Sequence, residues 1–465
     1  MTPQSSDKQP SDALVFFGAT GDLAYKQIFP ALQALVQRHN LDIPVIGVAK
    51  AGWNLDQLKA RARDSITQHG GIDEPAFAKL SSLLRYVDGD YRDPQTFAQL
   101  REALAKAHRP LHYLAIPPIM FDPVVEGIAQ CCASDARVVV EKPFGRDLDS
   151  AKQLDAALHR FFPERSIFRI DHFLGKEAVQ NILYTRFANS FLEPVWNRSL
   201  VSSVQITLAE NFDVRGRGKF YEEAGAIRDV IQNHLFQVLA CLAMDAPAGD
   251  NPAAMRDEKT RLLKAVRPLS PSDVVRGQYR GYRNEPGVAP DSNVETYAAV
   301  RLYVDTWRWA GVPFYLRAGK CLPVTVNEVI VSFQPPPRET FHENKSPVDA
   351  ARANHFRLRL SPEVTIALGM RVKEAGERMQ GEDVELIANH QEPKQMSPYE
   401  RLLGDALRGD QSLFTSDDSV EAQWRIVQPV LGDTTPVYEY GRNTWGPAEA
   451  ETQLAPPGGW IDPSA

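Results

Sequence analysis

The sequence predicts two domains of different class: an α/β domain with a parallel sheet, then a larger α+β domain built on a mostly antiparallel sheet. Through the first third of the 465 residues, apolar β-rich runs alternate with helical patterns, which is typical of parallel strands covered by helices on both faces. After about residue 175, segments alternate polar and apolar residues, as strands with one covered face do. The length suits two large domains, and we place the boundary between residues 178 and 179.

The individual elements follow from local patterns. Parallel strands are expected at 14–17, 45–49, 112–116 and 137–141. Apolar residues at 28, 29, 32, 35 and 36 recur at helical spacing, and Pro30 predicts either a kink in this helix or its restart with proline in the first turn. Strands of the second domain are expected at 202–210, 297–304, 328–334 and 356–361, with a helical stretch from Ala226 to Met244.

The composition of the chain argues against several classes of partner and location. The chain has 52 Lys+Arg against 59 Asp+Glu, a net charge of −7, which argues against a nucleic-acid or membrane surface as the main partner. The polar N-terminus lacks the apolar segment of an export signal, and no run approaches the roughly 20 apolar residues that span a bilayer. The four cysteines, Cys131, Cys132, Cys241 and Cys321, lack metal-ligand spacing and are few. We therefore expect a cytoplasmic protein.

A glycine-containing turn follows the first strand. Gly18 permits a tight turn, Gly21 lets the backbone approach a pyrophosphate, and Ala24 allows close helix packing, as in a Rossmann-type dinucleotide site. The spacing G-x-x-G-x-x-A only approximates the usual fingerprint, so an ordinary turn is the alternative. In the dinucleotide interpretation, the residues that contact the cofactor are Gly18, Thr20, Gly21, Asp22 and Leu23.

The end of the second strand bears on the choice of nicotinamide. An NAD site usually carries an acid there for the ribose hydroxyls, whereas this sequence offers Lys50 and no acid. Lys50 therefore favours NADP, with a solvated surface lysine as the alternative interpretation.

Two further segments carry ionisable residues at strand ends. Lys142 follows the strand at 137–141, at the sheet edge where ligands of open α/β folds bind. The segment 168–177 has five charged or ionisable side chains, of which Asp171 and His172 would face opposite ways on an extended strand. Since no further ligands lie nearby at suitable spacing, no metal site is expected.

A histidine lies in an otherwise apolar helical stretch. As an α-helix, 226–237 would place Val230, His234 and Gln237 on one face, and Arg228, Gln232 and Leu235 on another. His234 is then either a satisfied core histidine or the base that hydride abstraction from an alcohol requires. Lys320 adds a cation after the apolar run that begins at Pro313.

Together these segments resemble the glucose-6-phosphate dehydrogenase family. RIDHFLGKE (169–177) and RDVIQNH (228–234) are highly specific to that family, and the resemblance covers most of the chain. The other matching segments are LVFFGATGDLA (14–24), HYLAIPP (112–118), EKPFG (141–145), AENF (209–212) and GVPFYLRAGK (311–320).

The resemblance implies oxidation of glucose 6-phosphate at C1 to 6-phosphogluconolactone with hydride transfer to NADP, or to NAD, as the first step of the oxidative pentose phosphate pathway. His234 would be the general base and Asp171 the carboxylate that orients it. The residues implied in binding are His172 and Lys176 for the phosphate, Lys142, Glu210, Asp229 and Lys320 for the sugar, and Lys50, Tyr113 and Lys142 for the cofactor. Residues 1–178 would bind the dinucleotide, and 179–465 would bind substrate and form a homodimer or homotetramer.

Four positions depart from the family pattern. Gln27 replaces a basic residue, Lys50 an arginine, Phe173 a tyrosine, and Thr325 a second basic residue. A lysine cannot make the bidentate contact of an arginine. Two alternatives follow: a dehydrogenase acting on another hexose or hexose phosphate, and a nucleotide-binding regulator that has lost catalysis.

Overall fold

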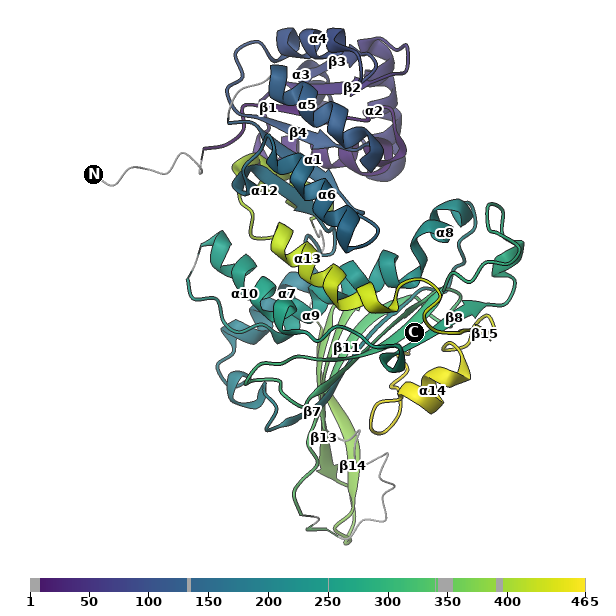
Figure 1. Ribbon diagram of the computed structural model, residues 1–465. Helices are drawn as coiled ribbons and strands as arrows, with labels where there is room; N and C mark the ends of the chain where they lie inside the picture. Colours follow the sequence, from purple (N-terminus) through teal and green to yellow (C-terminus); the bar gives the residue numbers. More distant parts are fainter. Residues whose placement is uncertain are drawn as a thin grey trace. The chain divides into compact units, whose positions relative to one another are not determined.

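The computed structural model describes residues 9–131, 135–249, 251–338, 340–341, 354–389 and 396–464 (Figure 1). The chain forms two compact units. Unit 1 comprises Met1–Glu177, Pro247–Asp257 and Gln395–Glu421, and unit 2 comprises Ala178–Ala246, Glu258–Lys394 and Ala422–Ala465. Two segments from beyond residue 179 thus belong to unit 1. A functional division of the chain at residues 178 and 179 stays a prediction.

Unit 1 contains a six-stranded sheet in which every neighbouring pair is parallel. Its order, β3-β2-β1-β4-β5-β6, is that of a Rossmann-type domain, as the alternation of patterns predicts. The strands are β1 (Ala13–Phe17), β2 (Val45–Ala49), β3 (Leu84–Asp88), β4 (Pro110–Leu114), β5 (Arg137–Glu141) and β6 (Ile167–Ile170). Because all six run the same way, their carboxyl ends lie at one edge.

Helices connect these strands: α1 (Phe29–His39), α2 (Leu55–His69), α3 (Glu74–Leu83), α4 (Pro94–Leu104), α5 (Phe121–Cys131) and α6 (Leu148–His159), with the 3₁₀ turns η3 (Pro118–Met120) and η4 (Glu164–Ser166). A late segment joins them, since α12 (Pro398–Arg408) contacts α1. Figure 1 shows α12, in yellow-green, among the purple and blue elements of unit 1. Leu402 and Leu403 of α12 are buried in the same core as Phe16 and Phe29, so unit 1 needs this distant segment.

The first helix restarts at Pro30. The π-helical turn η2 (Ala24–Ile28) precedes α1, and the N–H of Phe29 donates to the carbonyl of Ala24, five residues earlier. Pro30 then occupies the first turn of α1, where its missing N–H costs little. The change of hydrogen-bond register therefore falls at the residue that cannot donate.

Unit 2 contains a nine-stranded, mostly antiparallel sheet, as predicted, in the order β14-β13-β12-β11-β7-β10-β9-β8-β15. Two neighbouring pairs, β7 with β10 and β8 with β15, are parallel. The strands are β7 (Val201–Ala209), β8 (Val274–Tyr279), β9 (Tyr297–Tyr303), β10 (Pro313–Gly319), β11 (Val326–Phe333), β12 (His355–Ser361), β13 (Thr365–Lys373), β14 (Gly381–Asn389) and β15 (Val437–Tyr440).

The helices of unit 2 are α7 (Glu177–Ala188, which begins at the last residue of unit 1), α8 (Gly218–Ala226), η6 (Ile227–Leu235), α9 (Phe236–Ala243) and α14 (Ala448–Leu454), with the 3₁₀ turns η5 (Glu193–Val195), η7 (Pro271–Asp273), η8 (Tyr282–Asn284) and η9 (Gln428–Val430). The helices α10 (Pro252–Ala265) and α13 (Asp417–Val427) each run across a division between the units. In the part of the chain that the structure describes, every helix is too short or too polar to cross a membrane. Cys131, Cys241 and Cys321 form no disulfide, and Cys132 lies outside the described residues.

The element η6 corrects one expectation. Residues 227–235 form a π-helix, whereas the predicted faces assumed α-helical spacing. Because a π-helix bonds each N–H to the carbonyl five residues back, side chains four apart do not align as in an α-helix. Val230 and His234 are four residues apart within η6, and Gln237 lies in the following α-helix, so their grouping on one face stays a prediction.

A histidine is buried in the middle of the parallel sheet. His112 on β4 is fully buried, its ring centroid lies 6.2 Å from that of Phe17, and neither ring nitrogen has a hydrogen-bond partner. Burial lowers the pKa of His112 from 6.5 to about 3, because the core does not solvate a charged imidazolium.

The buried histidine predicts a stability loss in acid. Between pH 6.5 and 3 the unfolded chain binds a proton at His112 that the folded chain does not, so the free energy of unfolding falls as pH falls below 6.5. At pH 5 the expected loss is about 2 kcal/mol. We expect His112→Leu to reduce the fall in thermal midpoint between pH 7 and pH 5. His108→Leu, at an exposed histidine of the same unit, is the control, and an equal pH dependence in both variants would contradict the prediction.

Candidate active site

The glycine turn lies at the carboxyl end of β1, in the context that a dinucleotide site requires. Gly18 has φ of +80°, and a Cβ there would lie 2.2 Å from the carbonyl oxygen of Ala115, so only glycine fits. The N–H of Gly21 donates to the carbonyl of Gly18 at 2.9 Å. Gly21 and Asp22 are exposed just before the helix, where a helix start attracts phosphate groups. The residues present fit a dinucleotide.

Lys50 and Lys142 follow two other strands of the same sheet. Lys50 comes directly after β2, and its Nζ lies 2.9 Å from Oδ2 of Asp90. Lys142 follows β5 and is partly exposed. Both predicted cofactor contacts therefore lie at the edge that carries the glycine turn, because the strands are parallel.

The carboxyl group of Glu141 precedes Lys142 at the end of β5. Burial raises the pKa of Glu141 to about 7, although hydrogen bonds from Tyr113 and Tyr399 oppose the rise. The hydroxyl of Tyr113 donates to Oε1 of Glu141, and its ring is 1% exposed. A cofactor contact by Tyr113 stays a prediction. In the structure its side chain supports the end of β5.

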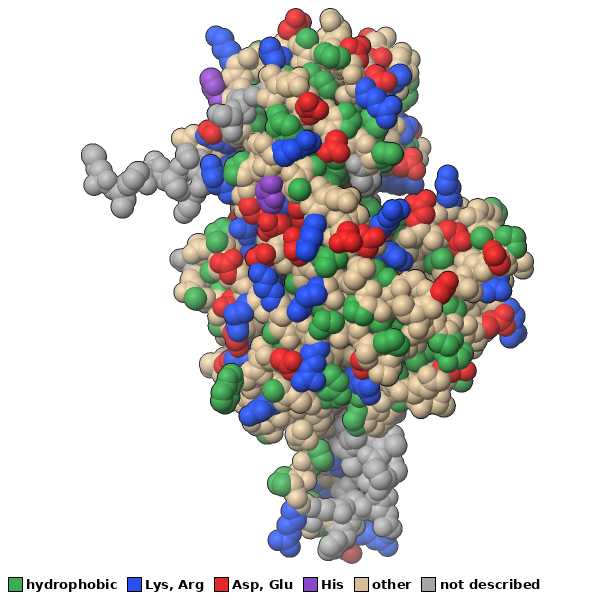
Figure 2. Space-filling view, viewed as in Figure 1, with side chains coloured by type: hydrophobic (Ala, Val, Ile, Leu, Met, Phe, Trp, Pro, Cys, Tyr) green, Lys and Arg blue, Asp and Glu red, His purple; other side chains and the backbone are tan. Residues whose placement is uncertain are grey.

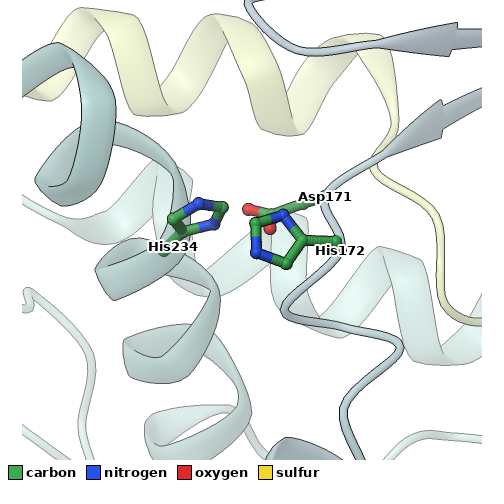
Figure 3. Close-up of side chains that lie close together, drawn as sticks. All are labelled: Asp171, His172 and His234. Atoms are coloured by element: carbon green, nitrogen blue, oxygen red, sulfur yellow. The ribbon is translucent and has the colours of Figure 1, made fainter. Parts of the chain in front are cut away.

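The segment after β6 forms a tight turn rather than an extended strand. β6 ends at Ile170, so strand alternation does not govern Asp171 and His172, contrary to the premise of the sequence analysis. Oδ1 of Asp171 accepts the N–H of Phe173 at 3.0 Å, and the N–H of Lys176 donates to the carbonyl of Phe173 at 3.0 Å. Asp171 is buried, whereas His172 and Lys176 are partly exposed. Figure 3 shows Asp171 and His172 on the loop that leaves the strand.

Aromatic rings line this turn. The Nζ of Lys176 lies 3.6 Å from the ring centroid of Phe173, which suits a cation–π contact. The ring of Tyr399, from the late segment of unit 1, is stacked on His172 with centroids 6.5 Å apart. Phe173 thus lacks the hydroxyl of the family's tyrosine and still provides a ring face for the lysine.

A buried ion-pair network supports the strand that leads into the turn. Arg169 is 1% exposed. Its guanidinium donates to Asp155 at 2.7 and 3.1 Å and to both oxygens of Glu164 at 2.9 and 2.8 Å. The carbonyl of Arg169 also accepts the N–H of Thr415 at 3.2 Å. These contacts fix the backbone two residues before Asp171.

His234 lies in the π-helix η6 of unit 2 and is 5% exposed (Figure 3). A glycine and a carboxylate fix the start of this helix. Gly225 has φ of +66°, and a Cβ there would lie 2.5 Å from Oε1 of Glu295. The same oxygen accepts the N–H of Ile227 at 3.1 Å, while Oε2 pairs with Nε of Arg276 at 3.2 Å. Nothing in the local pattern around His234 indicated this support.

Three predicted sugar-binding residues gather within unit 2. Glu210 follows β7 and Lys320 follows β10, and because these strands are parallel, Nζ of Lys320 reaches Oε2 of Glu210 at 2.6 Å. The pKa of buried Tyr221 is raised well above its usual value, first by burial and then by the charges of Asp229 and Glu210, so both carboxylates lie near this ring. This arrangement can hold hydroxyl groups through two acids and one cation.

Gln27 and Thr325 are the remaining departures from the family pattern. Gln27 is exposed in η2. Oγ1 of Thr325 donates to Oδ1 of Asn211 at 2.8 Å and accepts its N–H at 3.1 Å, so it fixes the segment after Glu210 and adds no charge. On the face shown in Figure 2, acidic and basic side chains are interspersed.

The support of η6 can be tested by a double substitution. Arg276 and Glu295 are 3% and 5% exposed, and removing one partner of a buried ion pair costs about 3–5 kcal/mol. We expect Arg276→Met to lower the thermal midpoint and to speed hydrogen exchange across residues 227–235. Adding Glu295→Gln should restore part of the thermal midpoint and part of the protection from hydrogen exchange, because it removes the buried carboxylate that Arg276→Met leaves without a cation. A double variant no more stable than Arg276→Met alone would contradict this role.

The fold and these residues define a class: a two-unit oxidoreductase with a Rossmann-type nicotinamide-binding domain. Two family models match the chain, "Glucose-6-phosphate dehydrogenase, NAD binding domain" at residues 15–181 and "Glucose-6-phosphate dehydrogenase, C-terminal domain" at residues 183–460. The chain therefore belongs to the glucose-6-phosphate dehydrogenase family.

Individual relatives agree with this assignment. The chain is 44% identical over 459 residues to "Glucose-6-phosphate 1-dehydrogenase 1" of Mycobacterium tuberculosis, covering 97% of each protein. A crystal structure of glucose-6-phosphate 1-dehydrogenase from Mycobacterium avium has a TM-score of 0.91 at 43% identity, with 98% of this chain and 99% of that chain covered. A structure titled as glucose-6-phosphate dehydrogenase with its substrate glucose 6-phosphate has a TM-score of 0.88 at 32% identity, with the same coverage.

Proposed function

We propose that this chain oxidises glucose 6-phosphate at C1 to 6-phosphogluconolactone and transfers the hydride to a nicotinamide cofactor. The observation that carries the proposal is membership of the family over nearly the whole chain, with the segments 169–177 and 228–234 present apart from the change at Phe173. The test is reduction of NADP or NAD by purified protein with glucose 6-phosphate, with glucose and other hexose phosphates alongside. Absence of turnover with every sugar, despite cofactor binding, would favour the regulator instead.

His234 is the general base in this proposal. It accepts the C1 hydroxyl proton while the C1 hydride leaves to the cofactor, and Asp171 orients its ring and stabilises the imidazolium. These roles are the ones that the family's motifs at 228–234 and 169–177 imply for the residues present here. Glu210, Asp229 and Lys320 hold the sugar hydroxyls, and their grouping within unit 2 supports that role.

His172 and Lys176 bind the 6-phosphate. Both are partly exposed on one turn of unit 1, and cationic side chains form charge-assisted hydrogen bonds with a dianionic phosphate. A dehydrogenase of non-phosphorylated sugars has no use for this pair, which favours a sugar phosphate over the alternative hexose substrates.

The cofactor is NADP in this proposal, with NAD as the alternative. The glycine turn with Thr20, Asp22 and Leu23 holds the pyrophosphate, and Lys50 holds the 2′-phosphate of NADP. When bound, the nicotinamide supplies the hydride acceptor. The absence of an acid at the end of β2 itself supports NADP.

A homodimer or homotetramer is part of the same proposal. Leu386 and Ile387 of β14, an end strand of the sheet as described, are 59% and 55% exposed, and exposed apolar residues on an edge strand are typical of contact surfaces. Cytoplasmic location is proposed with it, since one plant relative, from Arabidopsis thaliana, is named a cytoplasmic form.

Removing the base should affect turnover. We expect His234→Ala to lower kcat roughly 100-fold or more while the Kd for glucose 6-phosphate changes little. His108→Ala, at an exposed histidine, is the control. A large loss of substrate binding or of thermal stability, with kcat unchanged at saturation, would make His234 a structural residue.

Removing the phosphate cation should affect binding. We expect Lys176→Ala to raise the KM for glucose 6-phosphate about tenfold or more, since a hydrogen bond to a charged group contributes about 1.5–3 kcal/mol. Turnover of glucose itself should change little. Lys106→Ala is the matched control at an exposed lysine of unit 1. Equal losses of kcat/KM on glucose and on glucose 6-phosphate would rule out a phosphate role.

A further inference from the structure

A carboxylate stands beside the lysine that marks the ribose end of the dinucleotide site. In Rossmann-type domains the residue after the second strand contacts the ribose 2′ position, and here that residue is Lys50. Its Nζ lies 2.9 Å from Oδ2 of Asp90, and the two side chains are 71% and 40% exposed. Asp90 comes from the loop after the neighbouring strand β3. The position therefore carries a cation and an acid together.

The loop after β3 holds Asp90 in place. Oδ1 of Asp90 accepts the N–H of Arg92 at 2.9 Å, and its carbonyl accepts the hydroxyl of Thr96 at 2.8 Å. The N–H of Gly89 donates to the carbonyl of Ala49 at 3.0 Å. The N–H of Arg92, followed by Lys50, lowers the pKa of Asp90, so this carboxyl is ionised at neutral pH.

The same loop is tied to the glycine turn and to the backbone beside Lys50. The hydroxyl of Tyr91 accepts the N–H of Gly18 at 2.9 Å and donates to the carbonyl of Val48 at 3.1 Å. Oδ1 of Asp88 accepts the N–H groups of Ala51 and Gly52 at 3.0 and 2.9 Å. Lys50 and Asp90 therefore come from two backbone segments that are each fixed by hydrogen bonds.

The two charges act in opposite ways on the two cofactors. A carboxylate accepts hydrogen bonds from the 2′-hydroxyl of NAD, which is the usual role of the acid in NAD sites. The same carboxylate repels the 2′-phosphate of NADP and competes with it for Lys50. Lys50 in turn attracts the 2′-phosphate as a point charge without the bidentate geometry of an arginine.

We propose that Asp90 is a specificity-determining residue that lets this chain use NAD as well as NADP, by offering the 2′-hydroxyl an acceptor and by pairing with Lys50. This inference rests on the proposed function, because it assumes that the glycine turn binds a nicotinamide dinucleotide.

The experiment measures the Kd of NADPH and of NADH by fluorescence titration, and kcat/KM for NADP and NAD with saturating glucose 6-phosphate. We expect Asp90→Asn to shift both measurements toward NADP about tenfold at low ionic strength, lowering the Kd of NADPH relative to that of NADH and raising kcat/KM for NADP relative to that for NAD. The gain should shrink in 0.5 M salt. Asn keeps an oxygen for the N–H of Arg92 and removes the charge. Lys50→Gln, which leaves the Asp90 loop intact, should shift the ratio toward NAD.

The matched control is Asp93→Asn. Asp93 is the exposed N-cap of α4, and Asn caps a helix as well as Asp, so this variant removes one nearby charge without touching the Lys50 pair. An unchanged ratio in Asp90→Asn, or an equal shift in Asp93→Asn, would overturn the inference, as would a wild-type protein that binds only NADPH. If the reduced cofactors bind with the expected ratios and glucose 6-phosphate is not oxidised, only the proposed function is contradicted. Failure to bind either cofactor would sink both.

Discussion

The parallel alignment of the six strands in unit 1 is the constraint on which its site depends. Hydrogen bonding between parallel neighbours forces every carboxyl end to the same edge. Gly18, Lys50, Lys142 and Asp171 each follow a different strand, and they lie at one edge for this reason alone. The loop after β3 adds Asp90 to this edge. A cofactor site assembled in this way draws its residues from segments that are far apart in the sequence.

In unit 2, too, two parallel strands bring proposed site residues together, although the sheet is mostly antiparallel. β7 and β10 run parallel between antiparallel neighbours, and this pairing places Glu210 against Lys320. The π-helix η6 contributes Asp229 and His234. Its wider hydrogen-bond register is unusual over nine residues and is typical of functional segments. Its start depends on Gly225 and on the buried pair of Glu295 with Arg276.

Buried charges have a positioning role in both units. The guanidinium of Arg169 donates to two carboxylates, and that of Arg276 donates to one carboxylate and two carbonyl oxygens; both residues are at most 3% exposed. A buried ion pair contributes little net stability over apolar residues of the same volume, and its loss on one side is costly. Arg169 supports the strand that ends just before Asp171. Arg276 pairs with Glu295, whose carboxylate fixes the start of the helix that carries His234. We therefore regard them as positioning residues rather than as sources of stability.

The sequence by itself determined most of the strands, the two sheet classes, the glycine turn and the segments that place the chain in its family, because these features depend on local patterns of a few residues. It did not indicate β3, β6, β8, β10, β13, β14 or β15, and it assigned α-helical faces to a segment that is π-helical, because hydrogen-bond register is set by packing at both ends of that helix. Only the tertiary structure paired Asp90 with Lys50, stacked Tyr399 on His172 and placed α12 in the core of unit 1. Those contacts join residues 40 to more than 200 positions apart, and no local pattern encodes such a distance.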